Sequence, residues 1–350
     1  MSNPLHEIAL PIAIAAGFTA LQTVFDFQPI VKERGMVIYP LSGKRVWIAG
    51  HNGMVGSALV RALEARGDVS IIKAGRDVVD LKDQAAVRRW MKHERPDALI
   101  LAAAKVGGIL DNSTYPADYL YDNLMIEANI IEAAHREDVG KLLFLGSTCI
   151  YPKLAEQPIK EEALLTGALE VTNEAYAIAK ITGIKMCQAY RTQHGRDFIS
   201  AMPTNLYGPQ DNFDLNSSHV LPALIRKVHE AKHSGGKVTI WGTGTPRREF
   251  MHVDDLAQAL IFIMENYSEA PHLNVGIGED VTIRELAETT AKVIGYSGGF
   301  DFDASKPDGT PRKCTDNTRL RALGWAPSID LEKGIANTYK WFLENWKKAA

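Results

Sequence analysis

The stretch Arg45-Val-Trp-Ile-Ala-Gly50-His-Asn-Gly53-Met-Val-Gly56 decides the fold, because it joins a buried apolar run to three regularly spaced glycines. Gly50 suits the tight turn that ends a strand, and Gly53 lets backbone approach a pyrophosphate. Gly56 permits close packing of a helix whose N-terminus faces the anion. A helical apolar pattern follows at once, which is the context that this motif requires. The stretch therefore predicts the phosphate-binding turn of a dinucleotide domain.

Apolar segments of strand length recur along the chain and alternate with helical periodicity. They lie at residues 45–49, 69–73, 98–103, 141–145 and 198–202. The intervening stretches are long enough for crossover connections between parallel strands. The expected fold class is α/β, with a Rossmann-type doubly wound parallel sheet and a smaller C-terminal α/β substrate domain.

The domain borders are inferred from this pattern. We assign residues 41–206, with a returning segment near 250–276, to the dinucleotide-binding domain, and residues 207–249 and 277–350 to substrate binding. Residues 1–40 do not share the pattern, and we expect a disordered extension there. Pro11 interrupts the apolar run in this extension, and an acidic residue precedes the run where a signal peptide has a positive flank. We therefore expect no membrane segment.

Composition excludes several classes of function. The chain has 350 residues, of which 46% are hydrophobic and 23% charged, with a net charge of -3. This balance gives no broad cationic field for a nucleic-acid backbone, so we expect no nucleic-acid partner. Cys149, Cys187 and Cys314 have neither a zinc spacing nor an even disulfide pattern, so we expect no metal and a reducing, cytoplasmic location.

Tyr176 and Lys180 stand four residues apart, which puts a phenol and an ammonium on one face of a helix. A free tyrosine ionises near about pH 10, and a neighbouring cation favours its phenolate. Ser147 follows the predicted strand at 141–145, where residues line the ligand crevice of an open sheet. Taken alone, Ser147 would be a turn serine and Tyr176 a packed helix residue; together the three predict the proton relay of a dehydrogenase.

The residues after the second predicted strand indicate the cofactor. An NAD site places an acidic side chain there for the ribose 2'-hydroxyl, whereas this chain has Lys73-Ala-Gly-Arg76. An arginine would pair with the 2'-phosphate of NADP, so NADP(H) is favoured. Asp77, directly after Arg76, weakens the argument for NADP, and Asp80 is expected near the adenine. The alternative is that Arg76 is exposed and has no role in binding the cofactor.

These residues resemble the extended short-chain dehydrogenase/reductase family. The resemblance rests on Gly-x-x-Gly-x-x-Gly, the Ser/Tyr-x-x-x-Lys set and Trp241-Gly-Thr-Gly-Thr-Pro-Arg-Arg-Glu-Phe. Further motifs narrow it to one branch: Gly146-Ser-Thr-Cys-Ile-Tyr-Pro-Lys, Pro203-Thr-Asn-Leu-Tyr-Gly-Pro-Gln-Asp-Asn-Phe, Ser218-His-Val-Leu-Pro-Ala and Lys306-Pro-Asp-Gly-Thr-Pro-Arg-Lys. The resemblance implies conversion of GDP-4-keto-6-deoxy-D-mannose to GDP-L-fucose, by 3,5-epimerisation followed by NADPH-dependent reduction of the 4-keto group.

The same resemblance implies roles for individual residues. Cys149 matches the position of the base and His219 that of the acid in the epimerisation. Without the motif, Cys149 would be interpreted as a small buried residue and His219 as a residue at the start of a helix. Lys180 would hold the nicotinamide ribose and lower the tyrosine pKa, and Ser147 would orient the ketone. The implied substrate-binding residues are Lys227, Trp241, Arg248 and Asp308. The implied cofactor-binding residues are Gly50, His51, Asn52, Gly53, Met54, Val55, Gly56, Arg76, Asp80, Leu81, Leu145, Gly146, Lys180, Pro203, Thr204, Asn205, Leu206 and His219.

Two departures and two rivals stand beside this interpretation. Lys227 and Asn52 occupy positions where some relatives carry arginine, and the second departure bears on strictness for NADPH. Another sugar-nucleotide epimerase or dehydratase would share the fold, although dehydratases usually have Thr-Asp-Glu where this chain has Ser147-Thr-Cys149. A dinucleotide sensor without activity typically loses the Tyr/Lys pair. The family resemblance also suggests a homodimer with a four-helix contact that includes the Tyr176 helix, through faces at 125–130 and 184–188.

Overall fold

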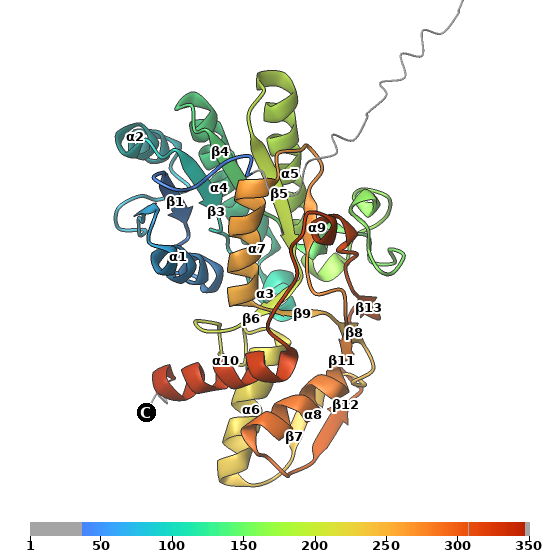
Figure 1. Ribbon diagram of the computed structural model, residues 1–350. Helices are drawn as coiled ribbons and strands as arrows, with labels where there is room; N and C mark the ends of the chain where they lie inside the picture. Colours follow the sequence, from blue (N-terminus) through green and yellow to red (C-terminus); the bar gives the residue numbers. More distant parts are fainter. Residues whose placement is uncertain (1–36, 307, 347–350) are drawn as a thin grey trace, which may run out of the picture. The chain divides into compact units, whose positions relative to one another are not determined.

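A six-stranded parallel sheet forms the centre of the structure, with the strand order β10-β5-β4-β3-β1-β2 (Figure 1). The computed structural model describes residues 37–306 and 308–346. The strands are β1 (Arg45–Ala49), β2 (Ser70–Ile72), β3 (Ala98–Leu101), β4 (Lys141–Leu145), β5 (Phe198–Pro203) and β10 (Leu273–Val275). All five predicted strands are confirmed, with ends that differ by at most two residues.

Helices cover both faces of this sheet, which is why its strands are apolar throughout. On one side, Val46 and Ile48 of β1 pack with α1 (Met54–Arg66) and α7 (Val253–Asn266). On the other side, Trp47 and Ala49 pack among three helices. These are α2 (Gln84–Glu94), α4 (Pro116–Arg136) and α5 (Glu174–His194). The fold is therefore the expected doubly wound α/β sheet.

A second set of elements follows β5 and packs around its own apolar cluster. Its helices are α6 (Val220–Ser234), α8 (Ile283–Ile294) and α10 (Leu331–Asn345). Its strands form three small sheets: β7 (Val238–Trp241) with β12 (Phe300–Asp303), β6 (Asn205–Tyr207) with β9 (Phe250–His252), and β8 (Arg247–Arg248) between β11 (Val281–Thr282) and β13 (Arg312–Lys313). Outside this set, the chain before β5 contains the short helix α3 (Ile109–Thr114) and the single helical turns η1 (Thr148–Ile150), η2 (Glu161–Ala163) and η3 (Val171–Asn173). The short helix α9 (Thr318–Ala322) packs on the main sheet through Leu320.

From Val37 onward the chain forms one compact unit, so the assignment of two domains stays a prediction. Of the expected extension, residues 1–36 lie outside the described residues. The amides of Ile38 and Tyr39 donate hydrogen bonds to the Glu265 carbonyl, at 2.8 and 3.0 Å. No helix among the described residues is long and apolar enough to cross a membrane.

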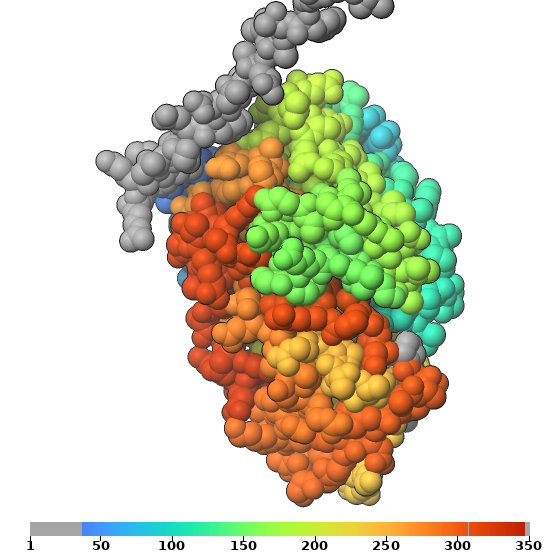
Figure 2. Space-filling view, turned by 90° about the vertical axis from the view of Figure 1, so that its right-hand side faces the viewer, coloured from blue at the N-terminus to red at the C-terminus, as the bar shows by residue number. Residues whose placement is uncertain are grey.

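The segment after η1 lies against the chain around β13, and the two are seen side by side in Figure 2 in green and orange-red. The Ile159 amide donates to the Cys314 carbonyl at 2.8 Å, and the Asp316 amide returns a bond to the Ile159 carbonyl at 2.8 Å. The buried Asn274 side chain donates to the carbonyls of Ile159 and Asp316. These bonds fix the distance between η1 and β13, two parts of the candidate site.

Candidate active site

The glycine turn has the geometry predicted for a phosphate-binding turn. Gly50 has a φ of 92°, and a Cβ there would lie 2.7 Å from the Ala103 backbone. A Cβ on Gly56 would lie 2.1 Å from the Gly50 carbonyl oxygen, whereas one on Gly53 would meet only that oxygen, at 3.5 Å. The first turn of α1 has no side-chain cap. Close packing at two glycines and open space at the third fit an incoming pyrophosphate at uncapped amides.

Arg76 lies in the turn after β2 with its side chain exposed. Nearby Lys73 pairs with Glu64 at 3.2 Å, but across residues 37–306 and 308–346 Arg76 forms no salt bridge. Its charge is therefore available to a 2'-phosphate. Burial lowers the pKa of His51 in the glycine turn, and Lys73 adds to the effect.

The other predicted cofactor residues lie next to the glycine turn or at and beyond the carboxyl ends of strands, since Leu145 ends β4 and Pro203 ends β5. Two of them already have partners: the Thr204 hydroxyl and the Asn205 amide donate to the Glu249 carbonyl, at 3.3 and 2.7 Å. Those two side chains hold β6 beside β9, and the Thr204 amide donates to the Val275 carbonyl at 3.1 Å. The remaining residues of the group are Met54, Val55, Asp80, Leu81, Leu145, Gly146, Pro203 and Leu206.

The structure brings Ser147, Tyr176 and Lys180 together, as the sequence predicts. The Tyr176 hydroxyl is hydrogen-bonded to the Ser147 side chain. The Lys180 ammonium lies 5.9 Å from the centre of the Tyr176 ring. It also lies 2.9 Å from a carboxylate oxygen of Glu127 on α4, and both side chains of this pair are buried. Ser147 and Tyr176 thus form a polar pair with a paired cation beside it.

The pKa of Tyr176 differs in direction from the sequence expectation. Burial raises this pKa well above its ordinary value, and nearby Cys149 and Glu127 raise it further, while the bond from Ser147 opposes them. The expected lowering by Lys180 does not prevail, because burial of the phenol dominates and because Glu127 pairs with that cation at 2.9 Å. Tyr176 therefore stays protonated over the physiological pH range, as a proton donor must.

Cys149 lies in η1 with its thiol partly exposed, whereas Cys187 and Cys314 are buried. The Asn173 side-chain amide donates to the Cys149 sulfur at 3.1 Å. The Lys313 ammonium lies 3.8 Å from the same sulfur. The thiol therefore lies among polar donors at the end of the relay, and the influence of Cys149 on the Tyr176 pKa shows that the two groups are neighbours.

His219 occupies the N-cap position of α6. Its side chain is accessible to solvent, yet protein surrounds it closely enough that desolvation lowers its pKa. The preceding residues are tied to α3, since the Gly108 amide donates to the Ser217 carbonyl at 3.1 Å. Desolvation thus favours the neutral ring, and His219 must take up a proton before it can act as a general acid.

Lys227 and Trp241 lie on α6 and β7, in the part of the chain expected to bind substrate. The Lys227 ammonium donates to the Thr239 carbonyl at 3.1 Å, and burial lowers the pKa of this lysine. The Trp241 side chain is 53% exposed, and the Lys306 ammonium lies 5.5 Å from the centre of its ring. An exposed indole beside a cation can flank an aromatic base or an anionic ligand.

Arg248 and Asp308 interact electrostatically. Burial lowers the pKa of Arg248, whose guanidinium donates to the Arg247 carbonyl at 2.8 Å. The Asp308 carboxylate accepts from the Thr243 amide and hydroxyl, at 2.7 and 2.9 Å. Asp308 thus fixes the turn after β7, a structural role that the sequence did not suggest.

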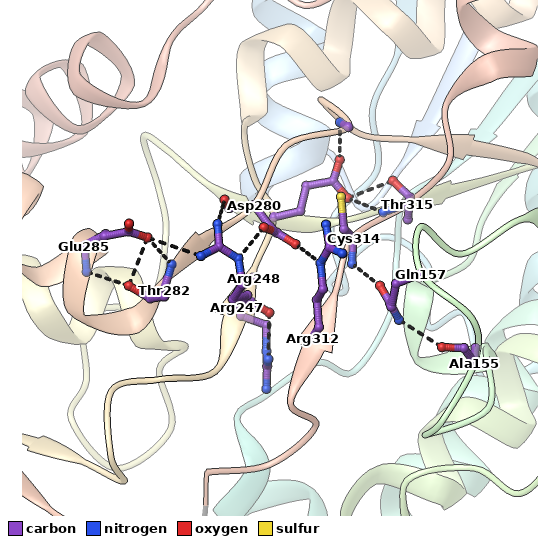
Figure 3. Close-up of polar contacts among 12 residues, drawn as sticks. Ala155, Gln157, Arg247, Arg248, Asp280, Thr282, Glu285, Arg312, Cys314 and Thr315 are labelled. Carbon is purple, nitrogen blue, oxygen red and sulfur yellow. Dashed lines mark hydrogen bonds and ion pairs between the residues drawn. The ribbon is translucent and has the colours of Figure 1, made fainter.

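An ionic clamp holds the small sheet that carries Arg248 and Lys313 (Figure 3). The carboxylate of Asp280 pairs with Arg247 of β8 and Arg312 of β13. Desolvation acts to raise the pKa of Asp280, but the two arginines outweigh it and the net pKa is lowered. The clamp fixes β13 to β8 just where β13 reaches the thiol.

Three polar residues of the site were missed from the sequence: Glu127, Asn173 and Lys313. Glu127 had one recognisable sign, since it stands three and four residues before the apolar Ile130 and Ile131 on a helix face. Lys313 belongs to a motif used for the resemblance, but only the pairing of β13 with β8 brings it to the thiol.

Comparisons with known proteins agree with this geometry. Residues 46–276 match the NAD dependent epimerase/dehydratase family. The chain is 60% identical over 315 residues to GDP-L-fucose synthase of Escherichia coli (strain K12), covering 87% of this chain and 98% of that one. The structure of a GDP-L-fucose synthetase from Naegleria fowleri bound to NADP is similar with a TM-score of 0.83 at 29% identity, covering 90% and 98%. A GDP-6-OMe-4-keto-L-xylo-heptose reductase from C. jejuni is similar with a TM-score of 0.83 at 37% identity, covering 87% and 99%.

Proposed function

The chain belongs to the NAD dependent epimerase/dehydratase family, and on this premise we propose that it converts GDP-4-keto-6-deoxy-D-mannose to GDP-L-fucose. It epimerises carbons 3 and 5 of the sugar and then reduces the 4-keto group with NADPH. One observation carries this assignment within the family: a partly exposed thiol, Cys149, lies beside the Ser147–Tyr176 pair. A simple reductase needs only the tyrosine, whereas an epimerase also needs a base.

For the reduction, Tyr176 donates a proton to the sugar oxygen while Ser147 orients the ketone. The high pKa of Tyr176 keeps that proton in place until negative charge develops on the oxygen. The glycine turn and Arg76 would hold NADPH, which would supply the hydride for carbon 4. Lys180, fixed by Glu127, binds the nicotinamide ribose.

For the epimerisation, the 4-keto group acidifies the protons on carbons 3 and 5. Cys149 removes each proton from one face, and His219 returns a proton from the other. The Asn173 amide faces the Cys149 sulfur, and His219, whose pKa is lowered by desolvation, donates once it has taken up a proton. One site thus performs both reactions on a substrate that stays bound through its GDP moiety.

Recognition of the GDP moiety is assigned to the β7–β8 region. Arg248 presents a planar set of donors to the pyrophosphate, and Lys227 adds a less directional charge. Trp241 flanks the GDP moiety with its exposed indole. Asp308 acts here by holding the turn that carries Trp241 and by facing Arg248.

The test is turnover. Purified protein is mixed with NADPH and GDP-4-keto-6-deoxy-D-mannose, and the product is identified by chromatography and NMR. GDP-L-fucose formed with equal consumption of NADPH supports the proposal. A product that is reduced but not epimerised would show that the protein is only a 4-reductase. An epimerised product formed without consumption of NADPH would contradict the proposed reduction.

We also propose a homodimer and a cytoplasmic location. The faces expected to form the dimer belong to the protomer core, since Ile130 and Ile184 are fully buried. Tyr121 on α4 and Ile178 on α5 are instead 61% and 42% exposed, which supports a contact through these helices. Sedimentation at micromolar concentration tests the dimer, and only monomer would overturn it. The three free cysteines support a reducing compartment, which cell fractionation tests.

A further inference from the structure

Two side-chain donors converge on the sulfur of Cys149, from parts of the chain that are far apart in sequence. Asn173 in η3 contributes its amide at 3.1 Å, and Lys313 in β13 contributes its ammonium at 3.8 Å. On the other side, the Cys149 amide donates to the Ser147 hydroxyl at 3.3 Å, which fixes the backbone below the thiol. The sulfur therefore faces one full positive charge and one neutral donor.

We propose that Lys313 and Asn173 are positioning residues that stabilise the thiolate of Cys149, so that this sulfur is the base of the epimerisation. The inference rests on the proposed function. A cation within about 4 to 6 Å favours the charged form of an acidic group, and a hydrogen bond to that form acts in the same direction. A thiolate, unlike a thiol, can take up a proton.

The charge of Lys313 is free for this purpose. Its neighbour Arg312 pairs with Asp280, but across the described chain Lys313 forms no salt bridge with a carboxylate. The two residues diverge because successive side chains of a strand point to opposite faces. The ionic clamp at Asp280 therefore holds Arg312 on one side and leaves Lys313 directed at the thiol.

The backbone around Lys313 is also fixed. Lys313 pairs in register with Arg248 of β8, a proposed pyrophosphate ligand. Just beyond it, the amide and hydroxyl of Thr315 donate to the buried carboxylate of Glu249, at 2.8 and 2.7 Å. A lysine on a strand held at both ends keeps its ammonium near the sulfur at little further entropic cost.

The other titratable groups near the thiol do not cancel this effect. Tyr176 on α5 is neutral at physiological pH because burial raises its pKa. Glu127, behind Tyr176, is paired with Lys180 at 2.9 Å. Glu170, at the start of η3, is engaged by Lys153 at 2.9 Å. Among these groups Lys313 is the unpaired charge that acts on the sulfur.

The proton transfer balances without Lys313 changing its state. The carbon–hydrogen bond beside the 4-keto group breaks, its electron pair moves into the enolate, and a sulfur–hydrogen bond forms on Cys149. His219 gives its proton to the opposite face of that carbon. Cys149 then releases its proton to water and His219 takes one up, while Lys313 keeps all three of its protons throughout.

The test measures the thiol itself, without substrate. Iodoacetamide alkylates Cys149 selectively, since Cys187 and Cys314 are each only 1% exposed, and mass spectrometry verifies the labelled residue. We expect Lys313→Met to slow alkylation at neutral pH by roughly tenfold and to move the midpoint of the rate–pH profile up by about one unit. Lys313→Arg should keep most of the wild-type profile. Lys333→Met, at an exposed site on α10, is the matched control.

Asn173 gives a second, independent variant. Asn173→Ala should raise the midpoint by less than Lys313→Met does, and Asn173→Asp should raise it more, because a carboxylate repels the thiolate. Thermal melts show whether each variant is folded. Identical alkylation profiles for folded Lys313→Met and the wild type would overturn the inference.

This test is separable from the test of the proposed function. If the wild type fails to exchange solvent deuterium into GDP-4-keto-6-deoxy-D-mannose while the alkylation profile still shifts in Lys313→Met, the function is wrong and the thiol–lysine relationship stands. If the wild type exchanges deuterium and the profile does not shift, the inference alone fails.

Discussion

The Lys180 ammonium lies 2.9 Å from the Glu127 carboxylate, and their side chains are only 2% and 1% exposed. Two charges removed from water in this way are costly unless they compensate each other. Glu127 therefore offsets the cost of burying the Lys180 side chain, and it also cancels much of the positive field at Tyr176. Together with burial of the phenol, which is the largest cause of the raised Tyr176 pKa, this relationship helps to keep the tyrosine a proton donor although a lysine stands beside it.

Replacing Glu127 tests that account. Glu127→Gln leaves Lys180 buried without its counter-charge, which should destabilise the fold by about 3 to 5 kcal/mol. Removing the negative charge also removes a cause of the raised Tyr176 pKa, so the pKa falls. NADPH oxidation needs the protonated tyrosine, and its loss at alkaline pH should begin at a lower pH than in the wild type. Glu132→Gln on the same helix is the control, and equal pH profiles for the two variants would refute the account.

Two variants separate the two reactions. Tyr176→Phe should reduce NADPH oxidation by roughly a hundredfold or more, yet still exchange solvent deuterium beside the ketone. Cys149→Ser should lose the exchange, because a serine hydroxyl stays protonated without a strong partner, while slow reduction yields an unepimerised 6-deoxy sugar. The exchange is followed by mass spectrometry. Wild-type exchange in Cys149→Ser would leave His219, or a water that it orients, as the base.

Cofactor choice depends on Arg76. A lost charged contact with phosphate is worth about 1.5 to 3 kcal/mol, or roughly ten- to hundredfold in binding. Arg76→Ala should therefore raise the Michaelis constant for NADPH by that factor and leave the constant for NADH almost unchanged. Lys73→Ala, whose charge is already paired with Glu64, serves as the comparison. An equal loss with both cofactors would show that Arg76 does not bind the 2'-phosphate.

His272 should make the fold less stable in acid. Burial lowers its pKa from 6.5 to about 4, with Arg319 and Lys185 adding to the effect. Between these values the unfolded chain binds a proton that the folded chain does not, so stability is lost as pH falls from 6.5 towards 4. The loss attributable to this group is at most about 3 kcal/mol. The buried Tyr151 hydroxyl lies 2.9 Å from the His272 ring nitrogen.

Urea unfolding at several pH values measures this effect. In His272→Gln, which keeps a donor for Tyr151 but cannot become charged, the free energy of unfolding should fall less between pH 7 and pH 5 than in the wild type. His233→Gln, at an exposed position on α6, should behave like the wild type. The same slope in all three proteins would contradict the buried-neutral assignment.

The sheet was predictable because each of its strands is buried on both faces and so reads as an unbroken apolar run. The strands of the small sheets are two to four residues long, and they alternate or carry charge, as at Arg247 and Arg312, so no such run marks them. The glycine turn and the Tyr176–Lys180 spacing could also be predicted from the sequence, since they depend on local geometry. The contacts of Lys313 and Glu127 could not be predicted, because they depend on which elements meet in three dimensions.

The pairing of β10 with β5 also bears on how the protein is made. β5 lies at the edge of a five-stranded sheet until Leu273–Val275 has left the ribosome, because all the elements from β6 to α7 are synthesised in between. During that interval Phe198–Pro203 presents open backbone groups and apolar side chains, which can pair with another unfinished chain. Synthesis that stalls or terminates between β6 and β10 should therefore yield aggregates. The length of the chain between β5 and β10 determines how long the edge of β5 needs protection by a chaperone.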